Sequence, residues 1–174
     1  KLEVPLLLFG YANPFYAMGE DSFARDAASV GVDGVIVPDL PPEEGESFFA
    51  QLRDNGIDTV LLAAPTTTRE RMQFIAERTR GFLYYVSLTG VTSARAGLTG
   101  GIQEGVALAK EFTQLPVCVG FGISKPEHGR AVGEFADGVV VGSAIVDLIE
   151  AAGSRDEAVD SVAGYVSEMK DALR

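Results

Sequence analysis

Short apolar segments alternate with helical patterns along all 174 residues, and this alternation constrains the fold more than any other feature. The apolar segments lie at 4–9, 34–37, 58–63, 82–86, 116–119 and 138–141. Helical patterns follow at about 20–31, 42–55, 68–80, 102–112, 126–135, from 143 onward and at 156–173. Uninterrupted apolar strands separated by helices are typical of a parallel sheet covered on both faces. The sequence therefore predicts a single α/β domain of six strand–helix units over residues 1–174.

The loops that follow the predicted strands distinguish between two α/β architectures. A doubly wound sheet binds ligands mainly at one switch point, whereas a (β/α)8 barrel builds its site from the loops after many strands. Nearly every predicted strand here is followed by an unusual loop: YANP, PDLPPEE, APTTT, SLTGVTS, GFGIS or GSA. This distribution favours the (β/α)8 TIM barrel.

Composition disfavours several function classes. The net charge of −11 argues against nucleic acid and anionic membranes as partners, because both need a basic surface. The longest apolar runs are too short to span a bilayer, and no secretory leader pattern opens the sequence, so we expect a cytoplasmic protein. Cys118 lies in a strand pattern and is predicted to be a small buried apolar residue. With one histidine, one cysteine and no HExxH or CxxC motif, we expect no metal site.

Glycines follow the last two predicted strands. Gly120 and Gly122 flank Phe121, and Gly142 precedes Ser143 at the start of a short helical pattern. Barrels often bind phosphate with the loops after their last two strands and a short extra helix. Backbone N–H groups at a helix start hold an anion, and glycines let that backbone approach the oxygens. We therefore predict a phosphate site here, although tight turns alone would also explain either glycine.

Five sequence blocks in register carry a family resemblance: LLLFGYANPF, GVIVPDLPPEE, YYVSLTGVTSARAG, GFGISKPE and VVVGSAIV. From Leu7 to about Ile149 the chain resembles the tryptophan synthase α chain family. The resemblance implies a lyase that cleaves indole-3-glycerol phosphate into indole and glyceraldehyde 3-phosphate during tryptophan biosynthesis. It also implies a chain that uses neither cofactor nor metal and that joins a β chain, which alone carries pyridoxal phosphate, in an α2β2-type complex.

The resemblance also assigns site residues. It places the substrate phosphate at Gly120, Phe121, Gly122, Gly142 and Ser143. The indole pocket would comprise Phe9, Tyr11, Leu62 and Val140, with Tyr84 as a supporting residue beside the glycerol end. A lid would cover Ser87–Gly97 and include Gly90, Thr92 and Ser93. Contacts with the β chain would lie around 13–15 and 39–41.

Two departures from the family pattern accompany this resemblance. Ser93 stands where the family usually has a glycine, which bears on the geometry of the lid. The six predicted strands match the third to the eighth of the family's eight, so the chain reads as an incomplete TIM barrel without the first two βα units. The family's catalytic glutamate and aspartate belong to the unmatched part, and we expect this segment alone to be inactive. The alternative function is that of another phosphate-binding barrel, or of a non-catalytic scaffold that binds a phosphorylated ligand or a partner.

Overall fold

A computed structural model describes residues 3–86, 98–120 and 122–173. Its strands are β1 (Leu7–Phe9), β2 (Gly34–Ile36), β3 (Asp58–Val60), β4 (Leu62–Ala63), β5 (Leu83–Val86), β6 (Val117–Gly120) and β7 (Gly138–Val140). Its helices are α1 (Ala12–Met18), α2 (Glu20–Ser29), α3 (Glu46–Asp54), α4 (Arg69–Arg78), α5 (Leu98–Phe112), α6 (Pro126–Gly133), α7 (Ser143–Ala151) and α8 (Arg155–Ala172). None of the helices within these ranges is long and apolar enough to cross a membrane.

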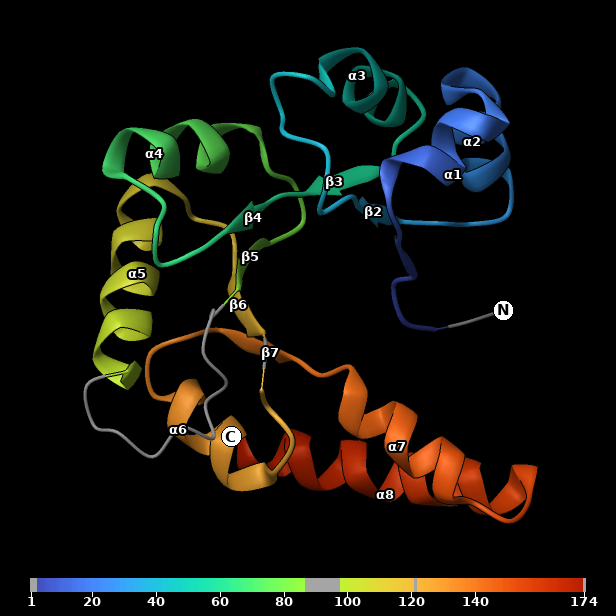
Figure 1. Ribbon diagram of the computed structural model, residues 1–174, viewed down its shortest axis with the longest axis vertical. Helices are drawn as coiled ribbons and strands as arrows, with labels where there is room; N and C mark the ends of the chain where they lie inside the picture. The colour runs from blue at the N-terminus through green and yellow to red at the C-terminus, as the bar shows by residue number, and fades with distance from the viewer. Residues whose placement is uncertain (1–2, 87–97, 121, 174) are drawn as a thin grey trace.

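The strands are parallel and follow one another in chain order. One sheet has the order β1-β2-β3, and a second has the order β4-β5-β6-β7. Figure 1 shows them along one curved path, with α1 to α6 placed around the outside. Within the described ranges, β1, β3, β4 and β7 each pair on one side only, and β1 and β7 lie at the two ends of the curved path (Figure 1).

The predicted strand at 58–63 is interrupted at Leu61, which separates β3 from β4. The Leu61 N–H donates to the Thr79 hydroxyl at 3.0 Å, on the side of the chain that faces β5, where the Leu61 carbonyl accepts from the Tyr84 N–H. Thr79, which is 2% exposed, also donates from its hydroxyl to the Phe82 carbonyl at 2.9 Å. A side chain from the loop after α4 therefore takes the place of a strand partner, and this divides the sheet.

Two apolar clusters cover the two faces of the strands. The larger cluster lies between strands and helices and includes Val35, Leu83 and Tyr85. The smaller cluster contains Ile36, Val60 and Tyr84, whose neighbours along β2 and β5 belong to the first cluster. Successive strand residues point to opposite faces, so the smaller cluster marks the inner face of the curved sheet. A core on each face is what the uninterrupted apolar strands predicted.

Candidate active site

The inner face gathers most of the predicted indole-pocket residues. Leu62 and Val140 pack against the inner cluster around Tyr84. The Phe9 ring meets the Tyr84 ring edge-on, with 6.4 Å between the ring centroids. These residues come from four strands (β1, β4, β5 and β7) because inward positions recur at every second residue.

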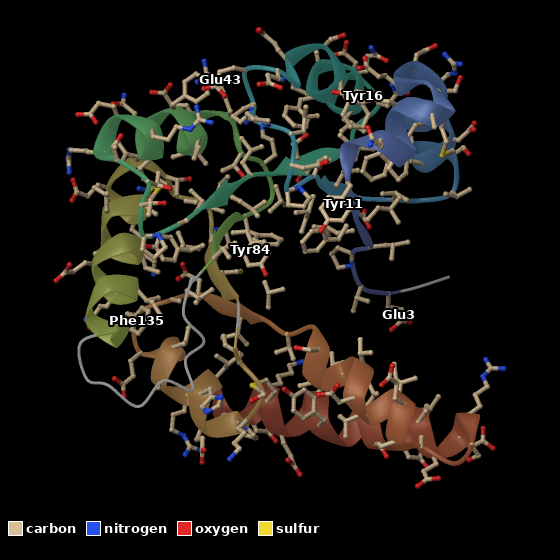
Figure 2. All side chains as sticks on the ribbon, viewed as in Figure 1. Glu3, Tyr11, Tyr16, Glu43, Tyr84 and Phe135 are labelled. Atoms are coloured by element: carbon tan, nitrogen blue, oxygen red, sulfur yellow. The ribbon has the colours of Figure 1, made fainter. Side chains whose placement is uncertain are left out.

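An apolar cavity of about 470 Å³ opens on this inner face. It is lined by Phe9, Gly10, Tyr11, Pro38, Leu62, Tyr84 and Val86. Figure 2 shows Tyr11 and Tyr84 on the side of the strands away from α3 and α4. The size and lining suit a planar apolar group, because ligand cavities are usually apolar with few polar groups. Val140 lies beside the inner cluster but does not line the cavity.

Sequence reasoning missed three residues that line this cavity: Gly10, Pro38 and Val86. Val86 follows Tyr84 at the spacing of one strand face, so the period of two would have identified it. Gly10 directly follows β1, and Pro38 lies two residues beyond the end of β2. In such loops, the local backbone conformation decides which residues line the cavity. Periodicity gives no signal at such positions.

Tyr84 is the most buried polar residue of the cavity, with 5% of its surface exposed. Burial raises the pKa of its phenol above the ordinary value, so the group stays neutral near neutral pH. Its ring also explains Gly120, because a Cβ at that position would overlap the Tyr84 side chain. The close approach that Gly120 permits is therefore made by Tyr84, and a phosphate contact at Gly120 stays a prediction.

Among the described phosphate residues, Gly122, Gly142 and Ser143 are exposed beyond the ends of β6 and β7. Gly122 has φ +74°, a conformation that favours glycine. Gly142 caps the start of α7, and a Cβ placed on it would meet nothing within 4 Å. Ser143 is the first residue of α7, and the first turn of that helix carries no acidic side chain. Open space beside a helix start without acids suits an anion.

Several predicted site residues lie outside the described ranges. They are Phe121 of the phosphate loop and the lid residues Gly90, Thr92 and Ser93. Their predicted roles, and the effect of Ser93 on lid geometry, stay predictions.

Acidic residues near the strand ends are engaged in structural contacts. The Asp39 carboxylate accepts from the Ala12 N–H at 2.9 Å and so caps the start of α1. Glu43 accepts from Arg71, whose Nη2 lies 3.0 Å from Oε2, and the hydrogen bond from Arg71 lowers the Glu43 pKa. Among the described residues, no aspartate or glutamate lines the inner cavity.

The predicted partner surface needs one correction. Phe15 was expected to contact a partner, but it is 7% exposed and packs against Phe23 with 4.6 Å between ring centroids. It belongs to the core between α1, α2 and α3. Pro41 is exposed and lines a separate cavity of about 400 Å³ at the loop after β2.

Cys118 is partly buried on β6. Burial raises its thiol pKa to about 11, which agrees with the predicted apolar role. The described residues contain no group of three or more histidine, cysteine, aspartate or glutamate side chains arranged to hold a metal ion.

The fold and the cavity together define a class of protein. Parallel strands in chain order, helices outside and a cavity lined from several strands are characteristic of α/β-barrel proteins. The family model of the tryptophan synthase alpha chain matches residues 1–174, and the chain belongs to that family.

Individual relatives agree with this assignment. The tryptophan synthase alpha chain of Cupriavidus metallidurans is 47% identical over 169 residues, covering 97% of this chain and 63% of the relative. That of Geobacter sulfurreducens is 45% identical over 173 residues, covering 99% and 65%. The chain thus spans less than two thirds of the length of these curated relatives.

Solved structures of the family share the fold. A tryptophan synthase subunit alpha from Legionella pneumophila superposes with a TM-score of 0.86 at 37% identity, over 99% of this chain and 64% of that one. A chain of the tryptophan synthase α2β2 complex from Pyrococcus furiosus gives 0.85 at 41% identity, over 96% and 67%. The prediction of a TIM barrel is confirmed, and the alternative of an unrelated phosphate-binding barrel is not favoured.

Proposed function

We propose that the protein carrying this chain is the α subunit of tryptophan synthase and cleaves indole-3-glycerol phosphate into indole and glyceraldehyde 3-phosphate. The observation that carries this proposal is the apolar cavity of the inner face, which four of the predicted indole and glycerol residues line: Phe9, Tyr11, Leu62 and Tyr84. The open start of α7 follows β7 directly. Because the carboxyl ends of parallel strands lie at one rim of a barrel, a ligand can reach from the cavity to that helix start.

Each end of such a substrate meets a matching environment. The indole ring would replace water against Phe9, Leu62 and Tyr84, which favours binding by removing apolar surface from water. The phosphate would accept hydrogen bonds from the N–H groups of Gly142 and Ser143 and from the Ser143 hydroxyl. The positive end of the α7 dipole would add to this attraction. Neutral Tyr84 would keep a hydroxyl for the glycerol end.

The acid–base step requires positioned carboxylates to deliver and remove protons. The described carboxylates do not line the cavity, and Asp39 and Glu43 are held in structural contacts. We propose that the catalytic pair is contributed from outside residues 1–174, so these residues by themselves release no measurable indole. We further propose that this subunit needs no cofactor and works with a pyridoxal-phosphate β chain that docks on the exposed loop around Pro41.

The test is substrate cleavage by the complete gene product, with Gly142→Asp as the informative variant. The new carboxylate would stand in the anion site without a packing clash, because a Cβ there meets open space. We expect calorimetric binding of glycerol 3-phosphate and indole release both to be lost, while the melting temperature is retained.

Gly101→Asp provides the matched control. It adds the same charge on α5, also where a Cβ meets nothing within 4 Å, and should leave binding and turnover unchanged. Equal phosphate binding by wild type and Gly142→Asp would show that the glycines only make turns.

A further inference from the structure

The outer face of the sheet carries a second cavity, of about 340 Å³, between α3 and α4. Helix α3 packs on α2 and α4 packs on α5, whereas α3 and α4 make no packing contact of similar extent. Figure 1 shows these two helices apart above the point where β3 gives way to β4. Figure 2 shows Glu43 at this gap, on the opposite side of the strands from Tyr11 and Tyr84. The cavity is therefore distinct from the proposed active site.

The floor of the cavity is apolar and well packed. Phe49, Ile57 and Leu61 are 8%, 2% and 4% exposed. The Phe74 ring forms part of the wall, and Thr59 adds a single buried hydroxyl-bearing side chain. A volume of about 340 Å³ over an apolar floor fits a small ligand with one ring.

The rim of the cavity carries charged side chains, and only some of them form ion pairs. Glu43 is held by Arg71. Glu77 lies 3.5 Å from Arg78, whose guanidinium stacks at 3.6 Å from the Phe74 centroid. Among the residues that the structure describes, the side chains of Arg53 and Arg80 have no ion pair or hydrogen bond.

These cations gather at one end of the cavity. Arg53 lies in the last turn of α3, Arg78 ends α4, and Arg80 follows it. Both helices return antiparallel to the strands they connect, so their final turns lie at the same end of the sheet. Glu43 and Glu46 lie at the other end, at the start of α3. A guanidinium presents a planar fork of donors that matches a carboxylate.

We propose that this cavity is a binding site for a small aromatic carboxylate, with the ring over Phe49, Ile57 and Leu61, beside Phe74, and the carboxylate between Arg53 and Arg80. The ligand enters from solvent through the α3–α4 gap. This site is separate from the cleavage reaction and does not depend on the proposed function.

Phenylacetate titrated into the complete gene product, followed by NMR, tests the proposal. We expect saturable binding, with contacts from the probe ring protons to the Ile57 methyl groups and the Phe74 ring. Arg53→Gln and Arg80→Gln should each weaken binding about tenfold or more, because each removes a charged hydrogen-bond donor. Both residues are exposed, so the variants should retain the melting temperature.

Two controls make the result decisive. Arg25→Gln removes an equal charge from α2, where Arg25 pairs with Asp21 away from the cavity, and should leave affinity unchanged. Phenethylamine has the same ring with a cation and should not bind. Absence of saturable phenylacetate binding, contacts to Leu62 and Tyr84 instead of Ile57, or equal loss with Arg25→Gln would each overturn the proposal.

Discussion

Two glycines lie against the tyrosine rings of β5, one on each face of the sheet. Gly120 faces Tyr84 on the inner side, and Gly105 of α5 faces Tyr85 on the helix side. The sequence singled out Gly120 as a position of close approach, and the structure identifies the approaching group as a side chain of the neighbouring strand β5. Pairing across a sheet joins residues far apart in the chain, so local sequence gives no signal for it. No prediction was made for Gly105, because its contact with Tyr85 also joins residues far apart in the chain.

Gly105→Ala should destabilise the protein, because its Cβ would overlap the buried Tyr85 ring. Overpacking of this kind costs about 1–3 kcal/mol. Gly164→Ala on α8 is the matched control, since its Cβ would meet open space and alanine favours a helix by about 0.5–1 kcal/mol. Urea unfolding of the two variants should give shifts of opposite sign. A stabilised Gly105→Ala protein would contradict the packing assigned here.

Asp137, which directly precedes β7, is hydrogen-bonded to residues of β6 and α5. Burial raises its pKa, but hydrogen bonds from the Val117 N–H at 2.9 Å and Lys110 at 3.0 Å outweigh this, and the pKa is lowered overall. A lowered folded-state pKa gives stability above the unfolded pKa of about 3.9, and this is lost as pH falls through the folded value. The melting temperature of Asp137→Asn should therefore be below wild type at neutral pH, and the difference should shrink below about pH 4. A difference between wild type and Asp137→Asn that stays constant over this pH range would refute the linkage.

At the scale of the elements, the break at Leu61 shows that a continuous apolar run in the sequence can contain an interruption of the strand. The sequence predicted one strand over residues 58–63, and from Val60 to Ala63 successive side chains do lie on alternate faces, but the strand is divided at Leu61. The division arises because the Thr79 hydroxyl, from the loop after α4, accepts the Leu61 N–H. A threonine at a helix end has many local uses, so its sequence position does not reveal a contact with a residue 18 positions earlier. The elements were predictable, whereas the way one loop interrupts them was not.

Thr79→Val should lower the free energy of unfolding by about 1–3 kcal/mol, because it leaves the buried Leu61 N–H without its acceptor. Thr79→Ser keeps the hydroxyl and should recover most of the loss. Chemical denaturation of both variants checks this. If valine and serine destabilise equally, the effect comes from packing and the hydroxyl has no special role.

At the scale of the whole molecule, the inner face is incompletely covered within the described ranges. Phe9 is 58% exposed on β1, and β7 is only half-buried, whereas β2 is buried throughout. The order of strands and helices followed from periodicity, and the phosphate site was predicted from the glycines that follow the last two strands. The indole-pocket and lid residues came from resemblance, because periodicity does not distinguish a pocket residue from a core residue. An unpaired parallel edge with apolar side chains favours association with other strands.

Expressed as an isolated chain, residues 1–174 should therefore self-associate through β1 and β7. Leu6 and Gly10 direct their backbone groups toward β2, so the alternate residues Leu7 and Phe9 present theirs to the open edge. Phe9→Lys should reduce association measured by analytical ultracentrifugation, because a charge on an edge strand opposes pairing. Met18→Lys replaces an exposed apolar residue on α1, away from the edge, and should change association little. Addition of the first two βα units of a full-length relative should convert the chain to a monomeric complex. A monomer in their absence, or association equally sensitive to both lysines, would show that the edges are not the associating surface.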